Sequence, residues 1–194
     1  MTFPEISLYK MACCPPGSAP FLASTYSPEG RKTTLSEVEF YEVNFEVKDK
    51  VVIIVPDIWG WDSGRTRSIA DMISRCGFRV VVPKLLLPAF EGGTDGDGLP
   101  PDFDMSVRGS EGFPYLLSFS WDMLKPKISA LLSHLKSEGA LTFGSVGFCW
   151  GAWVLANTAA DFPNDISGIA SPHPSIQLED VRGGKAAQLV AKVC

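Results

Sequence analysis

The run at positions 147–151 reads Gly-Phe-Cys-Trp-Gly, with Cys149 at its centre. Glycines two positions before and after a nucleophilic side chain are typical of a tight strand-to-helix turn, because they permit the strained backbone that pushes this side chain out of the sheet. The flanking sequence agrees, since residues 143–148 have strand character and residues 152–160 have helical spacing. The chain is therefore predicted to place a buried strand, Cys149 and a helix in direct succession.

A serine usually occupies the centre of this turn, whereas here it is a cysteine. The dipole and the N–H groups at a helix N-terminus favour a thiolate over a thiol, so the position supplies part of the activation that a cysteine nucleophile needs. The alternative is a small apolar core residue, which is what most free cysteines are. The predicted strand and helix favour the nucleophile, and Cys149 is the candidate catalytic residue.

The length of the chain, 194 residues with 45% apolar residues, is enough for one sizeable domain and short for two. We therefore expect a single domain over residues 1–194. Within it, residues 1–36 combine many Pro, Ser and Gly residues with no sustained periodicity, which predicts an N-terminal arm on the domain surface.

Charge and hydropathy argue against several classes of partner. A net charge of -5 without a Lys/Arg cluster argues against nucleic acid. The longest apolar runs, such as Val51–Val55, are far shorter than a membrane span, and the N-terminus lacks a basic-then-apolar signal pattern. The cysteines are odd in number and show no CxxC spacing, so we expect reduced thiols. These features predict a cytoplasmic protein with no membrane contact, no cofactor and no metal.

The first half of the chain carries the pattern of a sheet covered by helices. Residues 39–47 alternate polar and apolar side chains, which predicts a half-buried antiparallel region at the edge of the sheet. Val51–Val55 is wholly apolar and β-branched, as a central strand of a parallel sheet requires. Helical spacing over residues 64–76 and a further buried strand at 78–82 complete a right-handed strand, helix, strand unit.

The second half is less regular. Residues 83–120 are rich in Gly and Pro and predict a long irregular excursion that is functional or mobile. Residues 121–136 are predicted to form a helix and residues 165–170 a last buried strand. From Ser175 onward no cap, turn or closing strand is indicated.

Acidic residues in this irregular segment raise the alternative of a calcium-binding loop. Asp95, Asp97 and Asp102 lack the glutamate that such a loop needs at its twelfth position, so the spacing favours a solvated turn.

Two loops lie where open α/β sheets bind ligands, after the carboxyl ends of strands. Asp57, Ile58 and Trp59 follow the strand at 51–55, and His173 follows the last predicted strand. Asp57, Trp59 and His173 are candidate pocket residues, and His173 is expected to line the pocket rather than to act as a base. His134, on the helix at 121–136, is expected at the surface.

With these motifs in place, the sequence resembles the dienelactone hydrolase family of α/β-hydrolases. The resemblance covers most of the chain. It implies a three-layer α/β sandwich with a mostly parallel sheet, and hydrolysis of a small ester or cyclic enol-lactone. The matching segments are Cys13–Gly17, Asp57–Gly60, Ala70–Asp71, Gly77–Pro83, Gly147–Gly151 and His173–Pro174.

In that family a cysteine nucleophile is followed along the chain by an aspartate and a histidine, so the resemblance makes Cys149 the nucleophile. The backbone N–H groups of Trp150 and Ile58 are the expected oxyanion hole. Two positions depart from the family pattern: Lys84 stands where an aspartate is usual, and Asp57 stands where bacterial members carry a glutamate.

The residues after Ala170 are fewer than the roughly 60 that two further strand and helix units need. The acid and the base of the triad are therefore expected beyond Cys194, and the sheet is expected to lack its last strands and helices. The alternative function is an inactive shortened product, at most a thiol-reactive or binding protein. With a strand edge left open, the isolated chain is predicted to aggregate or fold only partly. The sequence indicates neither the substrate nor the oligomeric state.

Overall fold

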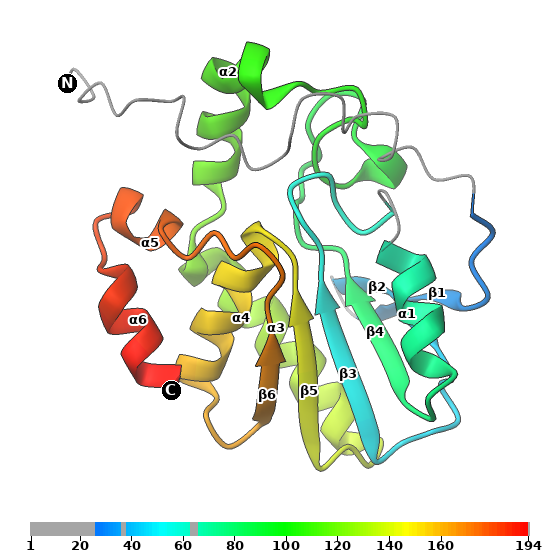
Figure 1. Cartoon of the computed structure of the whole chain (residues 1–194). Helices are drawn as coiled ribbons and strands as arrows, with labels where there is room; N and C mark the ends of the chain where they lie inside the picture. The colour runs from blue at the N-terminus through cyan, green and yellow to red at the C-terminus, as the bar shows by residue number, and fades with distance from the viewer. Residues whose placement is uncertain (1–25, 36–37, 63–65, 194) are drawn as a thin grey trace.

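The structure is a computed structural model that describes residues 26–35, 38–62 and 66–193. Its centre is a six-stranded sheet in the order β1-β2-β4-β3-β5-β6. Strands β4, β3, β5 and β6 run parallel, and β1 and β2 are added antiparallel at one side (Figure 1). The predicted α/β class with a mostly parallel sheet is therefore confirmed. The strands are β1 (Arg31–Leu35), β2 (Val38–Val43), β3 (Lys50–Val55), β4 (Arg79–Pro83), β5 (Thr142–Gly147) and β6 (Ile166–Ala170).

Helices cover both faces of the sheet, which makes three layers (Figure 1). Helix α1 packs with one cluster of buried side chains, while α3 and α4 pack with the larger cluster on the opposite face. Central strand β3 contributes to both clusters, which explains why its residues Val51–Val55 are all apolar. The helices are α1 (Thr66–Ser74), α2 (Met105–Ser118), α3 (Trp121–Ser137), α4 (Trp150–Asp161), α5 (Leu178–Val181) and α6 (Ala186–Val193), and a 3-10 turn spans Thr94–Gly96.

The antiparallel side of the sheet corrects two predictions. Residues 31–35, which composition assigns to the N-terminal arm, form β1 and pair with β2. Strand β2 lies between β1 and β4, so the antiparallel region predicted at the edge of the sheet is present, but five of the six residues of β2 are buried and the predicted half-burial is wrong. The sequence of β1 is largely polar because the strand is mostly exposed, so it carries no hydrophobic periodicity. Residues 1–25, including Cys13–Gly17, lie outside the described residues.

Helix α2 lies within residues 83–120, where an irregular excursion was predicted. Asp104 caps it by accepting a hydrogen bond from the Ser106 N–H at 2.8 Å. A helix was not expected because the segment contains Pro114 and two glycines. One of them, Gly112, is required by packing, since a Cβ there would lie 2.9 Å from the Phe103 ring.

The last residues also form helices that the sequence did not predict. Helices α5 and α6 lie beside α4, and their Leu178 and Leu189 side chains reach the large core cluster (Figure 1). Each helix is short, so its apolar face contributes a single buried side chain, and such a pattern is too brief to show a helical period.

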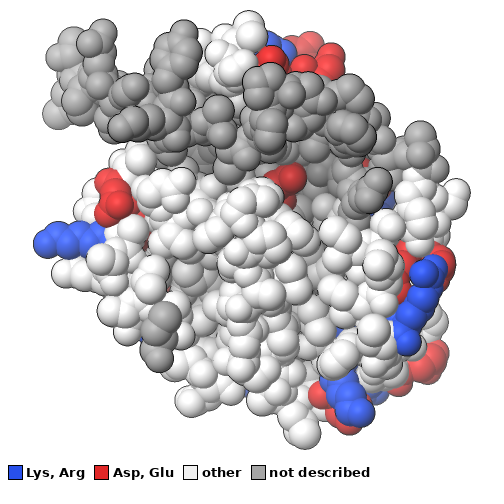
Figure 2. Space-filling view, in the orientation of Figure 1, with Lys and Arg blue, Asp and Glu red and all other residues white. Residues whose placement is uncertain are grey.

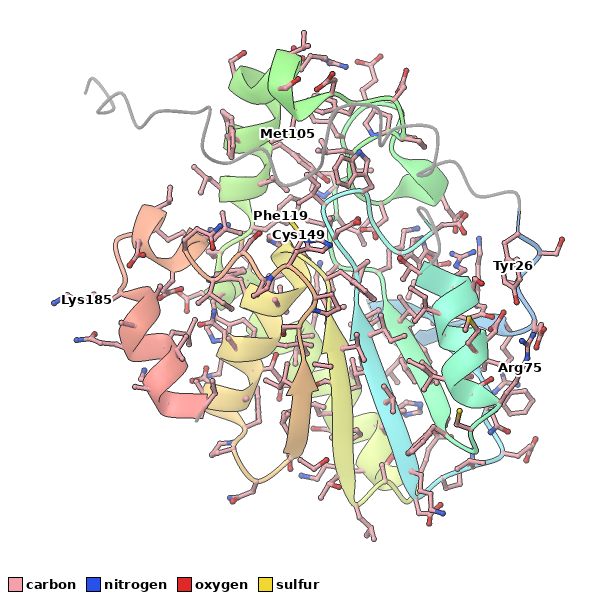
Figure 3. The ribbon with its side chains drawn as sticks, in the orientation of Figure 1. Tyr26, Arg75, Met105, Phe119, Cys149 and Lys185 are labelled. Carbon is pink, nitrogen blue, oxygen red and sulfur yellow. The ribbon has the colours of Figure 1, made fainter. Side chains whose placement is uncertain are left out.

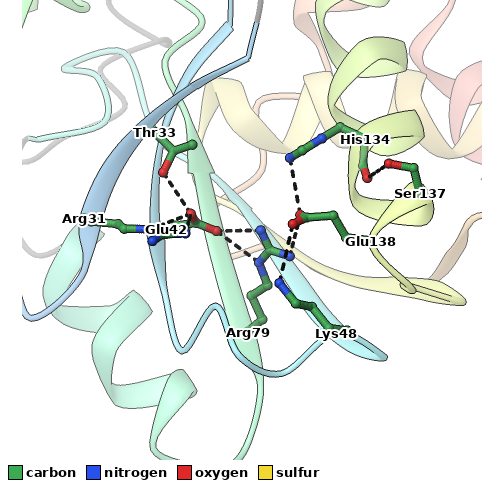
Figure 4. Close-up of polar contacts among 8 residues, drawn as sticks. All are labelled: Arg31, Thr33, Glu42, Lys48, Arg79, His134, Ser137 and Glu138. Carbon is green, nitrogen blue, oxygen red and sulfur yellow. Dashed lines mark hydrogen bonds and ion pairs between the residues drawn. The ribbon is translucent and has the colours of Figure 1, made fainter.

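A buried ion network joins the antiparallel strands to the end of α3 (Figure 4). Arg79 at the start of β4 is 2% exposed and pairs with Glu42 of β2, which is 1% exposed, at 2.6 Å. It also pairs with Glu138 at 2.8 Å, and His134 lies 3.3 Å from the same carboxylate oxygen. Burial raises the pKa of Glu42, but hydrogen bonds from Thr33, Arg79 and Arg31 outweigh burial, and the net pKa lies below its ordinary value. His134 thus belongs to this network, at the end of the sheet opposite the carboxyl ends of its strands.

The chain segment before β1 is fixed onto α1 by a buried carboxylate. Asp71 accepts hydrogen bonds from the hydroxyl of Tyr26 at 2.8 Å, from the N–H of Glu29 at 3.0 Å and from the hydroxyl of Tyr41. Arg75, one turn further along the helix axis, forms an ion pair with Glu29 (Figure 3). The Ala70–Asp71 motif therefore has a structural explanation in this chain.

Candidate functional site

Cys149 lies where β5 ends and α4 begins, at the carboxyl edge of the sheet (Figure 3). Its backbone has φ 51° and ψ -112°, a combination that costs a residue with a side chain on the order of 1–3 kcal/mol. Such strain is the hallmark of a strand-to-helix turn that presents a nucleophile. The succession of strand, Cys149 and helix is present as β5, Cys149 and α4, and the role of this turn as a nucleophile elbow stays a prediction.

The two flanking glycines are explained by close backbone approach. A Cβ on Gly147 would lie 2.8 Å from the backbone of Ala152 in the first turn of α4. A Cβ on Gly151 would meet the carbonyl oxygen of Val55 and lie 2.6 Å from that of Pro56. The turn therefore packs directly against the end of β3, and neither position has room for a side chain.

The segment after β6 returns to the turn and forms hydrogen bonds with both backbone groups of Cys149. The Cys149 N–H donates to the Pro172 carbonyl at 3.5 Å, and the Cys149 carbonyl accepts from the Ser175 N–H at 3.1 Å. The Cys149 Sγ and the Ser175 Oγ lie 3.3 Å apart. The cysteine is 3% exposed in this arrangement. Sequence reasoning missed Ser175, because only the tertiary fold brings it to the thiol.

The two expected oxyanion donors come from adjacent elements. The Trp150 N–H opens the first turn of α4, and the Ile58 N–H belongs to the loop after β3, which pairs with β5 in the sheet. Within residues 26–35, 38–62 and 66–193, no group accepts a hydrogen bond from either N–H. Both residues are buried, with Ile58 3% and Trp150 0% exposed, and their role as an oxyanion hole stays a prediction.

The loop that carries Ile58 has a regular internal geometry. The Asp57 carboxylate accepts from the Trp59 N–H at 3.0 Å, and the Asp57 carbonyl accepts from the Gly60 N–H at 3.2 Å. Trp59 is buried in the large core cluster, so its side chain supports the loop from the core side.

A buried carboxylate holds this loop against the excursion. Asp97 is 0% exposed, and its two oxygens accept the N–H of Trp61 at 2.8 Å and the N–H of Leu86 at 2.7 Å. Burial raises the pKa of Asp97 to about 6, and the two N–H donors oppose that rise. A solvated turn was predicted here, and for Asp97 that prediction is wrong. The Asp and Gly composition resembles an exposed turn, so local sequence gave no signal of the burial.

Glycines make the contact between the loop and the excursion possible. Gly98 has φ 70°, and a Cβ there would lie 2.5 Å from the carbonyl carbon of Trp59. Gly60 has φ 88°, and a Cβ there would lie 2.6 Å from the Asp97 carbonyl oxygen. Next to them, the Leu99 N–H donates to the Ile58 carbonyl at 2.9 Å. Segments 58–61 and 97–99 therefore pack backbone to backbone.

The remaining predicted site residue is His173, in the loop after β6. It has φ 40° between Pro172 and Pro174, is exposed, and forms no hydrogen bond or ion pair within the described part of the chain. The loop thus lies at the turn as expected, while the imidazole itself is not engaged with the thiol.

Other features of the described residues bear on ligands and partners. They contain no group of three His, Cys, Asp or Glu residues that could hold a metal ion. None of their helices is long and apolar enough to cross a membrane. The face in Figure 2 is largely uncharged, with Lys and Arg at its margins next to Asp and Glu.

Comparison with known proteins places this geometry in a family. The family model of the dienelactone hydrolase family matches residues 40–190. The human carboxymethylenebutenolidase homolog is 32% identical over 148 residues, which cover 75% of this chain and 56% of that protein. An uncharacterised AIM2 family protein of Schizosaccharomyces pombe is 30% identical over 174 residues, covering 85% of this chain and 66% of that protein. The chain thus spans little more than half the length of its curated carboxymethylenebutenolidase-like relatives.

Solved structures share the fold at low sequence identity. A candidate dienelactone hydrolase from Klebsiella pneumoniae has a TM-score of 0.57 and 18% identity, over 77% of this chain and 61% of that one. A dienelactone hydrolase from Anabaena variabilis has a TM-score of 0.52 and 15% identity, over 80% of this chain and 67% of that one. The family model matches residues 40–190, and the fold of the chain agrees with that match. The chain therefore belongs to the dienelactone hydrolase family.

Proposed function

We propose that this chain carries the nucleophile and the oxyanion hole of a hydrolase that acts on a small ester or lactone. The observation that carries the proposal is the strained turn at Cys149, with φ 51° at the first turn of α4. Strained backbone at a residue that tolerates it poorly persists where the surrounding structure and the function require it. Family membership supports the class of reaction.

In the proposed reaction the Cys149 thiolate attacks the carbonyl carbon of the substrate. Charge then develops on the carbonyl oxygen, where the N–H groups of Ile58 and Trp150 donate to it. The bond to the leaving oxygen breaks, the leaving group takes up a proton, and an acyl thioester remains on Cys149. Water hydrolyses the thioester, which releases the acid and regenerates the thiol.

The proton transfers need a general base, which the family supplies as a histidine paired with an aspartate. Neither His134 nor His173 forms a hydrogen bond with Cys149 in the described residues. Asp57, on the same loop as Ile58, is the proposed acidic neighbour of the thiol.

The test separates acylation from turnover. The full chain is mixed with an activated phenyl ester, and acyl groups on each cysteine are located by peptide mass spectrometry. We expect one acyl group on Cys149, and none in Cys149→Ala. Cys76→Ala is the matched control, because Cys76 is an exposed thiol at the end of α1 and lies outside the site. Acylation that survives in Cys149→Ala at the wild-type rate contradicts the proposal.

Turnover distinguishes the proposal from its alternative, a thiol-reactive protein without hydrolysis. An acyl group that forms on Cys149 and is then released as free acid, repeatedly, supports a hydrolase. An acyl group that forms once and remains supports the alternative, in which the chain lacks the means to activate water.

A further inference from the structure

We propose that Ser175 is a positioning residue for the Cys149 nucleophile: its hydroxyl donates a hydrogen bond to the thiolate, fixes the direction of Sγ and lowers the pKa of the thiol. The inference rests on the proposed function of Cys149 and concerns how that thiol is prepared for attack.

The backbone of residues 172–175 holds Ser175 at the thiol. Cys149 donates its N–H to Pro172 and accepts the N–H of Ser175 on its carbonyl, at 3.5 and 3.1 Å. These two bonds fix the loop against the one residue whose side chain reacts. The Oγ of Ser175 then lies 3.3 Å from Sγ, in a buried pair.

The local sequence explains why Ser175 points inward while its neighbour does not. The Pro-His-Pro run restricts the backbone on both sides of His173, which takes φ 40° and remains exposed. Ser175 itself is 6% exposed, and its carbonyl accepts the Leu178 N–H at 3.1 Å at the start of α5. The turn thus places a small hydroxyl residue, and not the imidazole, against the thiol.

Helix α5 anchors this arrangement on the far side of the loop. Glu179 accepts a hydrogen bond from the Trp153 Nε1 of α4 at 2.8 Å. Arg182 donates to the Leu116 carbonyl at the end of α2 at 2.7 Å, and its guanidinium lies 4.4 Å from the centre of the Trp153 ring. Ser175 is therefore held between two fixed points, the turn at Cys149 and the α4–α5 contact.

A hydroxyl at this place changes the ionisation of the thiol. Ser can accept from S–H or donate to S⁻, and the bond to the charged form is the stronger of the two. A thiolate that is 3% exposed lacks most of its hydration, so a fixed donor replaces part of it. Other titratable groups on elements that pack against the turn are Asp57 after β3, His173 in the same loop and Glu179 in α5.

The test follows the ionisation of each cysteine separately. The full chain is labelled with [¹³Cβ]cysteine, and the Cys149 resonance, assigned by its loss in Cys149→Ala, is titrated with pH. In Ser175→Ala we expect the midpoint of Cys149 to rise by about one pKa unit, a tenfold change in the thiol–thiolate equilibrium. Ser175→Thr keeps the hydroxyl and is expected to restore a midpoint near that of the wild type.

Two controls separate this role from a structural one. Ser167→Ala removes a hydroxyl that donates to the Phe143 carbonyl at 3.1 Å, on β6 and outside the turn, and it should leave the Cys149 midpoint unchanged. The exposed Cys76 serves as an internal reference in every variant. Thermal unfolding is recorded for each variant, because loss of packing alone lowers the melting temperature without shifting one thiol selectively.

The outcomes are distinct from those of the proposed function. A Ser175→Ala midpoint equal to that of the wild type, or lower, overturns the role of Ser175 even where Cys149 still takes up acyl groups. Acylation that persists in Cys149→Ala instead overturns the proposed nucleophile, whatever the titration shows. If Ser175→Ala does not fold, the comparison of Ser175→Thr with wild type decides, since a shift of a full unit with the hydroxyl retained contradicts the proposal.

Discussion

The two loops that meet at Cys149 are held in different ways. The loop after β3 is fixed by a buried carboxylate, Asp97, and by glycines that bring two backbones into contact. The loop after β6 is fixed by two backbone hydrogen bonds and one hydroxyl, next to a strand whose residues are partly or fully exposed. The first loop carries an expected oxyanion donor, and the second carries the thiol's neighbour. The loop with more buried contacts is thus the one that carries the proposed N–H donor, Ile58.

The difference extends into the sheet. On the side of β2 and β4 the charged residues are buried and interlocked through Arg79 and Glu42. On the side of β6 the ion pair of Lys136 with Asp165, at 2.7 Å, is largely exposed on its lysine. Substitutions matched in chemistry should therefore cost far more on the first side than on the second.

The largest expected effect is that of Arg79→Met. It leaves Glu42 buried without its main cation, and removal of one partner of a buried pair costs about 3–5 kcal/mol. Lys136→Met, the matched control, removes a surface pair and should cost less than about 1 kcal/mol. Urea unfolding of both variants measures the two free energies. Equal losses would mean that the two sides of the sheet are not held differently.

Gly151→Ala should destabilise by about 3 kcal/mol, because the new Cβ meets the backbone oxygens of Val55 and Pro56, which cannot move aside. Gly168→Ala on β6 is its counterpart, since a Cβ there has nothing within 4 Å. We expect that variant to be neutral or slightly more stable, by up to about 1 kcal/mol. The melting temperatures of both variants, measured by calorimetry, are compared with that of the wild type. A destabilised Gly168→Ala would show that β6 is packed more tightly than its exposure indicates.

Asp97→Ala removes the acceptor of two buried N–H groups and should cost about 2 kcal/mol or more. Its matched control is Asp95→Ala, which removes a carboxylate paired with Lys32 and Arg67 near the surface. Asp97→Ala should also slow acylation of Cys149, because the Ile58 loop loses its support, whereas Asp95→Ala should not. The rate of Cys149 acylation is measured by stopped flow, and the free energy of unfolding is measured on the same samples.

The raised pKa of Asp97 predicts a specific pH dependence. Because the folded pKa of about 6 exceeds the ordinary 3.8, the folded state prefers the protonated carboxyl. Its contribution to stability is fully present below pH 3.8 and is lost as the pH rises to about 6. The stability of wild type relative to Asp97→Asn should therefore fall across that window and then level off. A difference that stays constant from pH 4 to 7 would contradict the assigned ionisation.

The smallest effect is expected for Ser167→Ala, which removes one partly buried hydrogen bond on β6 and should cost about 1 kcal/mol or less. Urea unfolding measures it alongside the larger variants. A cost approaching that of Asp97→Ala would remove the contrast between the two loops.

The parts of the fold that the sequence predicted are those with long or local signals. Strand β3 is an unbroken apolar run, and α3 and α4 have several turns of helical spacing. The turn at Cys149 was predictable because glycines two positions before and two positions after it indicate that neighbouring segments of chain are in close contact there. Each of these signals lies within one continuous stretch of the chain, the longest being the 17 residues of α3.

The parts that the sequence did not predict depend on distant contacts. Asp97 is buried only because residues 58–61 and 84–86 fold around it, and its own neighbours read as an exposed turn. Ser175 lies 26 positions from Cys149 in the chain, and α5 and α6 each have one buried apolar side chain. Helix α2 was hidden by Pro114, since proline inside a helix usually signals a break. The resemblance to a family implies the roles proposed for Cys149, Ile58 and Trp150 but implies none of these supporting contacts.

The carboxylate of Asp97 has a consequence for how variants of this protein are interpreted. Its oxygens bind two backbone N–H groups and the residue has no exposed surface. A mutational scan scored only by the proposed hydrolase activity would therefore rank position 97 beside Cys149, the proposed nucleophile, and a substitution there would be classed as a loss of chemistry. Scoring the same library for the abundance of folded protein would separate the two positions. Cys149→Ser would remain abundant, while substitutions at position 97 would be depleted.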